Sequence, residues 1–261
     1  MTVSVPTSQR TAVVNLWDAH WAHYRPAALD QLDTPFARHA FAGLSRLMGN
    51  EATQILEVGC GTGRFCARLA TARPHAQITG VDLAPASLAI ARTLPATLGL
   101  PNLAFVDADM FDLPYPDAYF DAVFSEGVIQ HFDTSNGSRE ALMREMRRVL
   151  KPGGELITSV VNWHCYPHTV YKFLLRVRKA AYEYGYEKSY TRRELSRYLS
   201  LNGFDVVDWC GYYPAHGFYR LAGYSRAFKW LGRIAEWAPP RATQAFGFEI
   251  WVKARKPTRG Q

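Results

Sequence analysis

The sequence has few cysteines and no long apolar run. Its four cysteines are scattered through 261 residues without any Cys-x-x-Cys pair: Cys60, Cys66, Cys165 and Cys210. This pattern argues against a disulfide framework and a zinc site. The first residues, MTVSVPTSQRT, lack the basic and apolar segments of a signal peptide, and no apolar stretch is long enough to cross a bilayer. We therefore expect a reduced, cytoplasmic protein with free thiols.

The glycine-rich stretch ILEVGCGTGRF, residues 55–65, lacks the spacing of two common nucleotide-binding loops. A dinucleotide fingerprint is G-x-G-x-x-G, but here the third glycine comes one residue early and Arg64 stands where it is needed. A P-loop requires Gly-Lys-Ser/Thr, which does not follow. Because Glu57 precedes the first glycine by two residues, the loop suits a positively charged ligand better than a pyrophosphate.

The net charge of +7 is confined to two segments of the chain. Residues 162–190 hold five basic and two acidic side chains, and residues 215–245 hold five basic and one acidic, whereas the rest has 20 of each sign. The apolar fraction of 48% and the charged fraction of 20% are typical of a globular protein, and the length favours one elaborated domain. The two basic segments therefore need a separate explanation.

Short apolar segments alternate with helical patterns along the chain. Strands are expected at 53–58, 77–82, 103–109, 120–127, 155–161, 205–213 and 246–256. Helices are expected at 63–72, 85–94, 138–150 and 191–204, the last opened by a Thr191–Glu194 capping box. Residues 1–50 predict two further helices, with Trp17, Trp21 and Tyr24 on one face of the first. This order predicts an α/β fold, a mostly parallel sheet with helices on both faces.

Four motifs at the expected strand ends resemble the class I S-adenosylmethionine-dependent methyltransferases. They are LEVGCGTGRF, GVDLAPASLAIAR, VDADMFDLPYPDAYFDAVFSEGVIQHF and EMRRVLKPGGELI. The resemblance covers residues 50–161 strongly and 191–256 more weakly. It implies a Rossmann-like, seven-stranded, mostly parallel sheet with N-terminal helices and helical cap insertions. It also implies S-adenosylmethionine as the cofactor.

The same resemblance implies which residues hold the adenosine half of the cofactor. Asp82, at the end of the second strand, would accept hydrogen bonds from both ribose hydroxyls, and Leu83 would pack beside the adenosine. Asp109 would accept from the adenine amine, and Met110 would cover the ring. The alternative is that Asp82 is an ordinary helix cap and Asp109 an ordinary turn residue.

Further residues would hold the methionine half. The glycines of the loop would let it approach the backbone: Gly59, Gly61 and Gly63. Glu57 would orient the ammonium group directly or through water, or else would only bond loop amides. Glu126 and Gly127 would offer backbone groups near the sulfonium.

Two aromatic features lie near the expected site. His131, just past the fourth strand in GVIQHF, is a candidate general base, with an orienting or packing role as the alternative. Trp17 and Tyr24 are candidates for an N-terminal lid over the cofactor, with plain helix packing as the alternative and packing favoured for Trp21.

The resemblance implies one methyltransferase domain over residues 1–261. Its parts would be a helical lid at 1–50, the cofactor-binding core at 51–161, cap insertions at 162–190 and 215–245, and C-terminal core at 191–214 and 246–256. The apolar cap faces, which include Phe173, Tyr184, Tyr224 and Phe228, would wall an acceptor pocket or pack on the sheet. Their basic faces would meet solvent, an acidic acceptor or an anionic membrane.

The expected function is methyl transfer to a small-molecule acceptor, as in small-molecule biosynthesis, with an oxygen favoured because His131 is available. The SPPY-type tetrapeptide of many amino-group methyltransferases is replaced by SEGV. Methylation of carbon or nitrogen and a non-catalytic module that binds the cofactor stay open as alternatives. No recognisable RNA-binding module is present, so nucleic acid is not the expected partner. The identity of the acceptor and the oligomeric state are left open.

Overall fold

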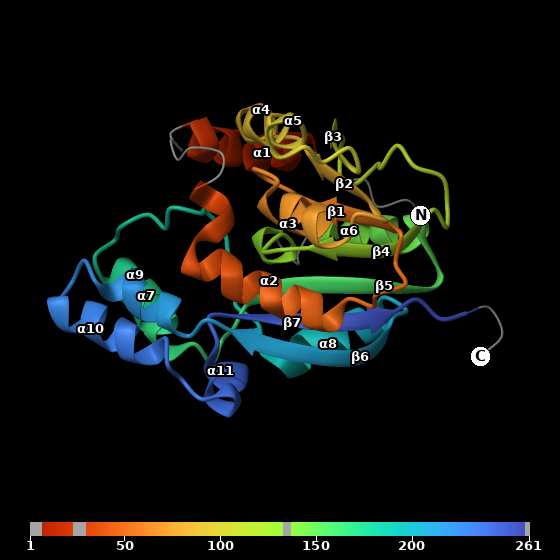
Figure 1. Cartoon of the computed structure of the whole chain (residues 1–261). Helices are drawn as coiled ribbons and strands as arrows, with labels where there is room; N and C mark the ends of the chain where they lie inside the picture. The colour runs from red at the N-terminus through yellow and green to blue at the C-terminus, as the bar shows by residue number, and fades with distance from the viewer. Residues whose placement is uncertain (1–6, 23–29, 133–136, 259–261) are drawn as a thin grey trace.

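A computed structural model describes residues 7–22, 30–132 and 137–258 of the chain. Its centre is one seven-stranded sheet with helices on both faces, shown in Figure 1. The strands are β1 (Gln54–Val58), β2 (Gln77–Asp82), β3 (Leu103–Asp107), β4 (Phe120–Ser125), β5 (Leu150–Val161), β6 (Asp205–Tyr212) and β7 (Glu249–Arg255). The expected fold class is confirmed.

The strand order is β3-β2-β1-β4-β5-β7-β6. The first five strands in this order pair in parallel, and β7 is antiparallel to both of its neighbours, β5 and β6. The chain leaves β1 toward β2 and β3 on one side and returns to β4 on the other. The carboxyl ends of β1 and β4 are therefore the switch point where open α/β sheets bind ligands.

The two sheet faces are buried under different helices. Ile55 belongs to a buried cluster with residues of α2 (Pro35–Leu47) and α3 (Arg64–Ala72), and the next residue, Leu56, belongs to a cluster with residues of α6 (Ser138–Val149) and α8 (Arg192–Leu201). Successive strand residues point to opposite faces, so both faces require apolar side chains. The apolar side chains of Ile55, Leu56 and Val58, which fall on both faces of β1, follow from this burial.

Helices α4 (Pro85–Ala91) and α5 (Leu94–Leu98) follow β2, where one helix over 85–94 was expected. The N-terminal helix α1 (Thr7–Ala22) lies against α4, and Asp18 Oδ1 accepts a hydrogen bond of 2.8 Å from Ala86 N. Two short 3-10 helices, η1 (Asp30–Asp33) and η2 (Ile129–His131), complete this half of the fold. Tyr24 lies outside the described residues.

The expected capping box is confirmed at α8. Thr191 Oγ1 accepts from Glu194 N at 3.2 Å, and the Glu194 carboxylate accepts from Thr191 N at 2.8 Å. Two strand starts were wrong: β5 begins at Leu150 and includes the KPGG turn residues, since Leu150 already pairs with Phe120, and β7 begins at Glu249, because Phe246 still belongs to α11.

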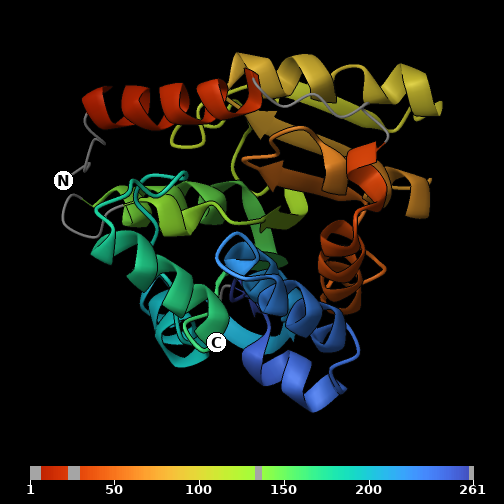
Figure 2. The same cartoon turned by 90° about the vertical axis from the view of Figure 1, so that its left-hand side faces the viewer.

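The basic segments form a group of helices at one end of the sheet. They are α7 (Tyr166–Val177), α9 (Ala215–Leu221), α10 (Arg226–Ala235) and α11 (Pro240–Phe246). Figure 2 shows α7 and α10 beside each other, and both pack against α9. We call these four helices and residues 178–190 the cap. Phe173 and Tyr184, both expected on apolar cap faces, do not lie on one helix, because α7 ends at Val177 and Lys179 has a φ of 52°.

Candidate active site

A cavity of about 280 Å³ opens at the carboxyl ends of β1 and β4. Its walls come from the glycine loop, the ends of β2 and β4, helix α1 and the cap. The residues that the sequence indicated and that line this cavity are Trp17, Glu57, Gly59, Gly61, Asp82, Leu83, Met110, Glu126, Gly127 and His131. Gly63 and Asp109 are outside this lining.

The glycine loop turns back against β2. The N–H groups of Gly59 and Cys60 donate to the carbonyl of Val81 at 2.9 and 3.0 Å. Gly63 opens α3 with a φ of 78°, and a Cβ atom there would lie 2.4 Å from Cζ of Phe105. Positive φ and this close approach both require glycine. Although Gly63 lies outside the cavity wall, it sets the path of the loop that forms the wall.

The carboxylate of Asp82 holds the loop and faces the cavity. Its Oδ2 accepts from Gly61 N at 2.7 Å and its Oδ1 from Ala84 N at 2.9 Å. Burial raises the pKa of Asp82, and these backbone hydrogen bonds oppose the rise. A carboxylate offers about four lone-pair sites, so each oxygen retains capacity for a ligand hydroxyl. The structure thus gives Asp82 a part in fixing the loop as well as a place at the cavity.

Asp109 occupies a turn beside the cavity. Its Oδ1 accepts from Phe111 N at 2.9 Å, which is the local turn bond considered as the alternative. Met110 and Phe111 supply the apolar wall at this point, and Phe111 had not been indicated by the sequence. Recognition of the adenine amine by Asp109 stays a prediction.

Three carboxyl groups line the cavity where β1 and β4 end and β7 begins: those of Glu57, Glu126 and Glu249. Glu57 accepts a hydrogen bond from Cys66 Sγ at 2.8 Å, and burial raises the pKa of Glu57 to about 8. Burial also raises the pKa of Glu249 to about 8, while Ser159 Oγ and the Tyr212 hydroxyl donate to it.

Glu126 forms an ion pair of 3.0 Å with Arg64, a residue that also lines the cavity. Among the described residues, Arg64 is thus the one cation paired with these three carboxyl groups. A ligand with one or more positive charges would complement the remaining acidic groups and favour their ionised forms. Gly127 N donates to Ser159 Oγ at 3.1 Å, so the group that Gly127 can offer a ligand is its carbonyl.

Helix α1 covers the glycine loop with aromatic side chains. A Cβ atom on Gly61 would lie 3.4 Å from Cζ2 of Trp21, and Trp17 lies with its ring edge-on to His131 at 5.0 Å. Tyr184 from the cap stacks on Trp17 at 5.7 Å. The α1 helix and the cap therefore meet over the cavity, as a lid would. Trp21, for which packing was favoured, also lines it.

His131 is held in one orientation by the cap. Its Nδ1 lies 2.9 Å from the carbonyl oxygen of Tyr186, which can only accept a hydrogen bond. The proton of the neutral ring is therefore assigned to Nδ1, which leaves the lone pair on Nε2, 3.4 Å from Gln130 Nε2. Burial lowers the pKa of His131, so the neutral ring predominates at pH 7.

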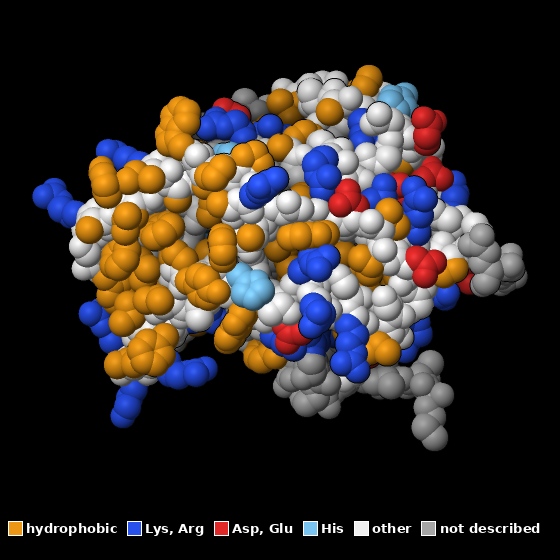
Figure 3. Space-filling view, turned by 90° about the horizontal axis from the view of Figure 1, so that it is seen from below, with side chains coloured by type: hydrophobic (Ala, Val, Ile, Leu, Met, Phe, Trp, Pro, Cys, Tyr) orange, Lys and Arg blue, Asp and Glu red, His pale blue; other side chains and the backbone are white. Residues whose placement is uncertain are grey.

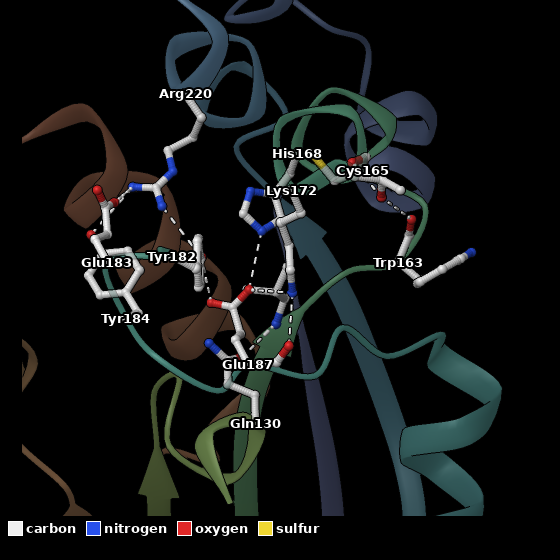
Figure 4. A network of polar contacts seen from close by, with 12 residues as sticks. Gln130, Trp163, Cys165, His168, Lys172, Tyr182, Glu183, Tyr184, Glu187 and Arg220 are labelled. Atoms are coloured by element: carbon white, nitrogen blue, oxygen red, sulfur yellow. Dashed lines mark hydrogen bonds and ion pairs between the residues drawn. The ribbon is translucent and has the colours of Figure 1, made fainter. Parts of the chain in front are cut away.

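Figure 4 shows the polar network that fixes this part of the cap. Glu187 accepts from His168 Nε2 at 3.2 Å, from the Tyr182 hydroxyl at 2.9 Å and from Lys172 Nζ at 3.3 Å. Burial alone would raise the pKa of Glu187, but the hydrogen bond and charge of His168 and the charge of Lys172 lower it to about 2. Glu187 is therefore an ionised carboxylate in the cavity wall.

Arg220 of α9 also lines the cavity. Its guanidinium carbon is 5.0 Å from the ring centres of Tyr171 and Tyr184, and it forms an ion pair with Glu183. Nearby, the His216 ring packs 4.4 Å from that of Phe248, and burial lowers the pKa of His216 to about 3.

Sequence reasoning missed several of these cavity residues. Those from the cap and from β7 are Tyr182, Glu187, His216, Arg220 and Glu249. No motif marks them. Of the four residues expected to form the apolar cap wall, Tyr184 lines the cavity, whereas the expectation for Phe173 was wrong because that side chain is 61% exposed.

Comparison with known proteins agrees with this geometry. A family model described as a methyltransferase domain matches residues 56–158. The chain is 38% identical to a demethylmenaquinone methyltransferase of Thermus thermophilus over 40% of this chain and 45% of that protein. It is 36% identical to ajmaline N-methyltransferase of Rauvolfia serpentina over 40% of this chain and 34% of that protein. The aligned part is thus less than half the length of these relatives.

Solved structures share the fold over nearly the whole chain. A Haloferax volcanii protein solved with the Trm112 methyltransferase activator has a TM-score of 0.64 at 19% identity, over 92% of this chain and 97% of that one. The [4+2]-cyclase SpnF has a TM-score of 0.61 at 22% identity, over 98% of both chains. At this identity the likeness shows the fold alone.

Proposed function

We propose that this chain, which carries a class I S-adenosylmethionine-dependent methyltransferase domain over residues 56–158, methylates an oxygen of a small apolar or aromatic acceptor. One observation carries the proposal: the same cavity is lined by the glycine loop, by His131 and by an acidic cluster, which consists of Glu57, Glu126 and Glu249. The expected setting is small-molecule biosynthesis in the cytoplasm, without a nucleic-acid partner.

The residues present fit S-adenosylmethionine by the chemistry of the cavity wall. Its methionine half carries an ammonium and a sulfonium, which Glu57 and Glu126 would complement. Its ribose carries two hydroxyls, for which Asp82 has acceptor capacity. Its adenine is a flat ring, for which Met110 and Phe111 provide an apolar wall. When bound, the cofactor supplies an electrophilic methyl group that is activated by its own positive charge.

The chain's own contribution is alignment and a proton acceptor. The glycine loop and the acidic groups would hold the donor end in place, and α1 with Tyr184 would exclude water from above. Nε2 of His131 carries the lone pair that would take the proton of an acceptor hydroxyl as the oxygen attacks. The carbonyl of Tyr186 would stabilise the imidazolium that forms, and so would the charge of Glu187.

The acceptor class follows from the aromatic and cap residues that line the cavity. Trp17, Tyr184, Phe132 and Phe248 supply apolar and aromatic area, whereas Arg220 and the Tyr182 hydroxyl are polar. This combination suits a mainly apolar molecule with one polar or anionic group. It also agrees with the absence of an SPPY-type tetrapeptide, since SEGV stands at residues 125–128.

Two alternatives to O-methylation remain as proposals of lower rank. Methylation of carbon or nitrogen would use the same cofactor site without needing His131 as a base. A non-catalytic module that binds S-adenosylmethionine would keep the acidic cluster and lose turnover. His131 and Gln130 both line the cavity, and the Nε2 lone pair of His131 accepts from Gln130 Nε2 at a long 3.4 Å. An acceptor hydroxyl that displaces this contact would meet the lone pair, which favours the O-methylating version.

The test is methyl transfer from labelled S-adenosylmethionine to a panel of phenols, hydroxylated lipids, amines and carbon acids. We expect labelled product from a hydroxyl compound, with no product from its O-methylated analogue. Product from amines alone would replace the oxygen proposal by N-methylation. Tight binding of S-adenosylmethionine by calorimetry with no product from any class would favour the binding module, and no binding at all would overturn the proposal.

A further inference from the structure

Helix α7 presents an apolar stripe to solvent. Tyr166, Val170, Phe173 and Val177 recur at the spacing of one helix face, and their exposed fractions are 58%, 46%, 61% and 62%. The opposite face of α7 is the packed one, since His168 is fully buried there. The stripe is therefore an apolar face of α7 that the other cap helices leave exposed.

Helix α10 presents a second stripe of the same kind. Trp230, Ile234 and Trp237, which follows the helix, are 62%, 49% and 88% exposed. The inner side of α10 packs through Gly232 against Tyr219, where a Cβ would come within 2.5 Å of the ring. Seen from below, hydrophobic side chains gather at the end of the molecule that carries the cap, with Lys and Arg around their edge (Figure 3).

Phe246, at the end of α11, extends the exposed apolar stripe of α7. It is 47% exposed, and its ring centre is 6.0 Å from that of Tyr166. We call the two stripes together with Phe246 the apolar cap surface. Exposed apolar area of this extent is unusual on a monomer and indicates an interaction site.

Exposed cations accompany the apolar cap surface on all three helices and on the residues that follow α7. They are Arg176, Arg178, Lys179, Arg226, Lys229, Arg233 and Arg241. Among the described part of the chain, none of the seven takes part in an ion pair. The two acids of the cap are Glu187, which lies in the buried network, and Glu183, which pairs with Arg220; Glu236, directly after α10, accepts from the Tyr219 hydroxyl. The cap surface is thus apolar with a net positive charge.

We infer that the apolar cap surface docks the protein on an anionic membrane leaflet. Trp, Tyr and Phe side chains favour the interface between headgroups and acyl chains, and Lys and Arg beside them attract anionic lipid. A second copy of this chain would instead bring two sets of like charges together across a symmetric interface. No helix of the described residues is long and apolar enough to cross a membrane, so the contact is peripheral.

Docking in this way would serve the proposed reaction. The cap that carries the apolar surface also supplies Tyr182, Tyr184 and Arg220 to the cavity wall. A mainly apolar acceptor dissolved in the bilayer would then reach the cavity without crossing water. This last step rests on the proposed function, whereas docking itself does not.

Vesicle co-sedimentation in the absence of any acceptor tests the docking. We expect binding to phosphatidylcholine vesicles that contain phosphatidylglycerol, much weaker binding to phosphatidylcholine alone, and weakening by salt. Tryptophan fluorescence should shift to the blue on binding. No binding to anionic vesicles at low salt would overturn the inference, and it would leave the methyl-transfer assay unaffected.

Two variants with matched controls assign the contact to this surface. Phe173→Ser with Trp230→Ser should remove most of the fluorescence shift and most binding, whereas the comparably exposed pair Leu201→Ser with Val207→Ser should not. At about 1 kcal/mol for each cation, Gln at Arg226, Lys229 and Arg233 should weaken binding roughly a hundredfold.

The control for charge is Gln at Arg144, Arg193 and Arg197, three exposed cations on α6 and α8. It carries the same change of net charge, so it should keep most of the affinity. Equal loss in both triple variants would overturn docking through the cap. So would a dimer in sedimentation velocity that Phe173→Ser with Trp230→Ser converts to monomer, because the surface would then bind a second copy.

Discussion

Nδ1 of His131 lies 2.9 Å from the carbonyl oxygen of Tyr186. The two residues come from different parts of the chain, η2 after β4 and the cap between α7 and α8. Lys188 N donates to Gln130 O at 2.9 Å, so the same cap segment is tied to η2 twice. The cap therefore determines the tautomer of the candidate base and not only the shape of the acceptor cavity.

If His131 is the general base, His131→Ala should lower kcat about 10²- to 10⁴-fold and leave the affinity for S-adenosylmethionine nearly intact. The wild-type rate should rise with pH as the imidazolium loses its proton. Because burial lowers the pKa of His131, this rise should be centred below 6.5, although Glu187 and Glu126 oppose the shift and Lys172 supports it. The rate should then be level above pH 7. A loss below tenfold, or collapse of cofactor binding, would make His131 a structural residue.

Glu57 should make stability depend on pH in a known direction. Its pKa is raised to about 8 in the folded protein from about 4.5 in the unfolded chain. Between these values the folded state holds a proton that the unfolded state has released, so stability falls as pH rises through this range. Glu57→Gln removes this dependence. Urea unfolding should show equal stability at pH 5 and a variant more stable than wild type at pH 8, by roughly 1–3 kcal/mol.

The same variant should respond differently to the cofactor. The positive charges of S-adenosylmethionine favour ionised Glu57, so the wild-type affinity should increase from pH 6 to pH 8. In Glu57→Gln this increase should be smaller, and the affinity at pH 8 lower. Glu51→Gln, at an exposed position, serves as the control. A stability difference between Glu57→Gln and wild type that does not vary with pH would contradict the ionisation assigned to Glu57.

The fold was predictable because the strands are buried on both faces. Such strands carry apolar side chains toward both faces, as Ile55, Leu56 and Val58 of β1 do, and the turn residues at their ends are separately recognisable. Helix starts with local signals were also predictable, as the Thr191–Glu194 capping box shows. The end of α7 was not, because the helical pattern continues past Val177 and only the backbone at Lys179 breaks it.

The cavity residues from the glycine loop and from the ends of β2 and β4 were predictable from contiguous motifs, whereas those from the cap were not. Glu187, His216 and Arg220 come from three separate parts of the cap that only the tertiary fold brings together. Phe173 shows the opposite failure. Helical periodicity indicated an apolar face correctly, but periodicity does not say whether a face is covered, and here it is exposed.

Gly63→Ala should destabilise the protein more than Gly99→Ala. Both glycines have positive φ, 78° and 63°, so both substitutions carry the same backbone cost of about 1 kcal/mol. Only at Gly63 would the new Cβ meet a neighbour, Phe105 Cζ at 2.4 Å, while nothing lies within 4 Å at Gly99. Overpacking adds about 1–3 kcal/mol, which urea unfolding of the two variants should resolve. Equal destabilisation would show that the loop shifts to make room.

We expect Asp82 to bind the cofactor directly, in addition to holding the glycine loop. Asp82→Asn keeps one oxygen for a backbone N–H group and removes the charged acceptor for ribose hydroxyls. We expect a loss of about 1–3 kcal/mol in S-adenosylmethionine affinity by calorimetry. Asp107→Asn is the matched control, because Asp107 pairs with Asp82 across the parallel β2–β3 ladder and its side chain is exposed.

The two roles of Asp82 separate by comparing the intact cofactor with 5′-methylthioadenosine, which retains the ribose and adenine but lacks the amino-acid half. If Asp82 binds the ribose hydroxyls, the asparagine variant should lose a similar factor for both ligands. If Asp82 acts only by fixing Gly61, the loss should be confined to the intact cofactor, because the loop lies against its methionine half. Unchanged affinity for both, with a lowered melting temperature, would leave Asp82 a structural residue of the loop and remove the ribose assignment.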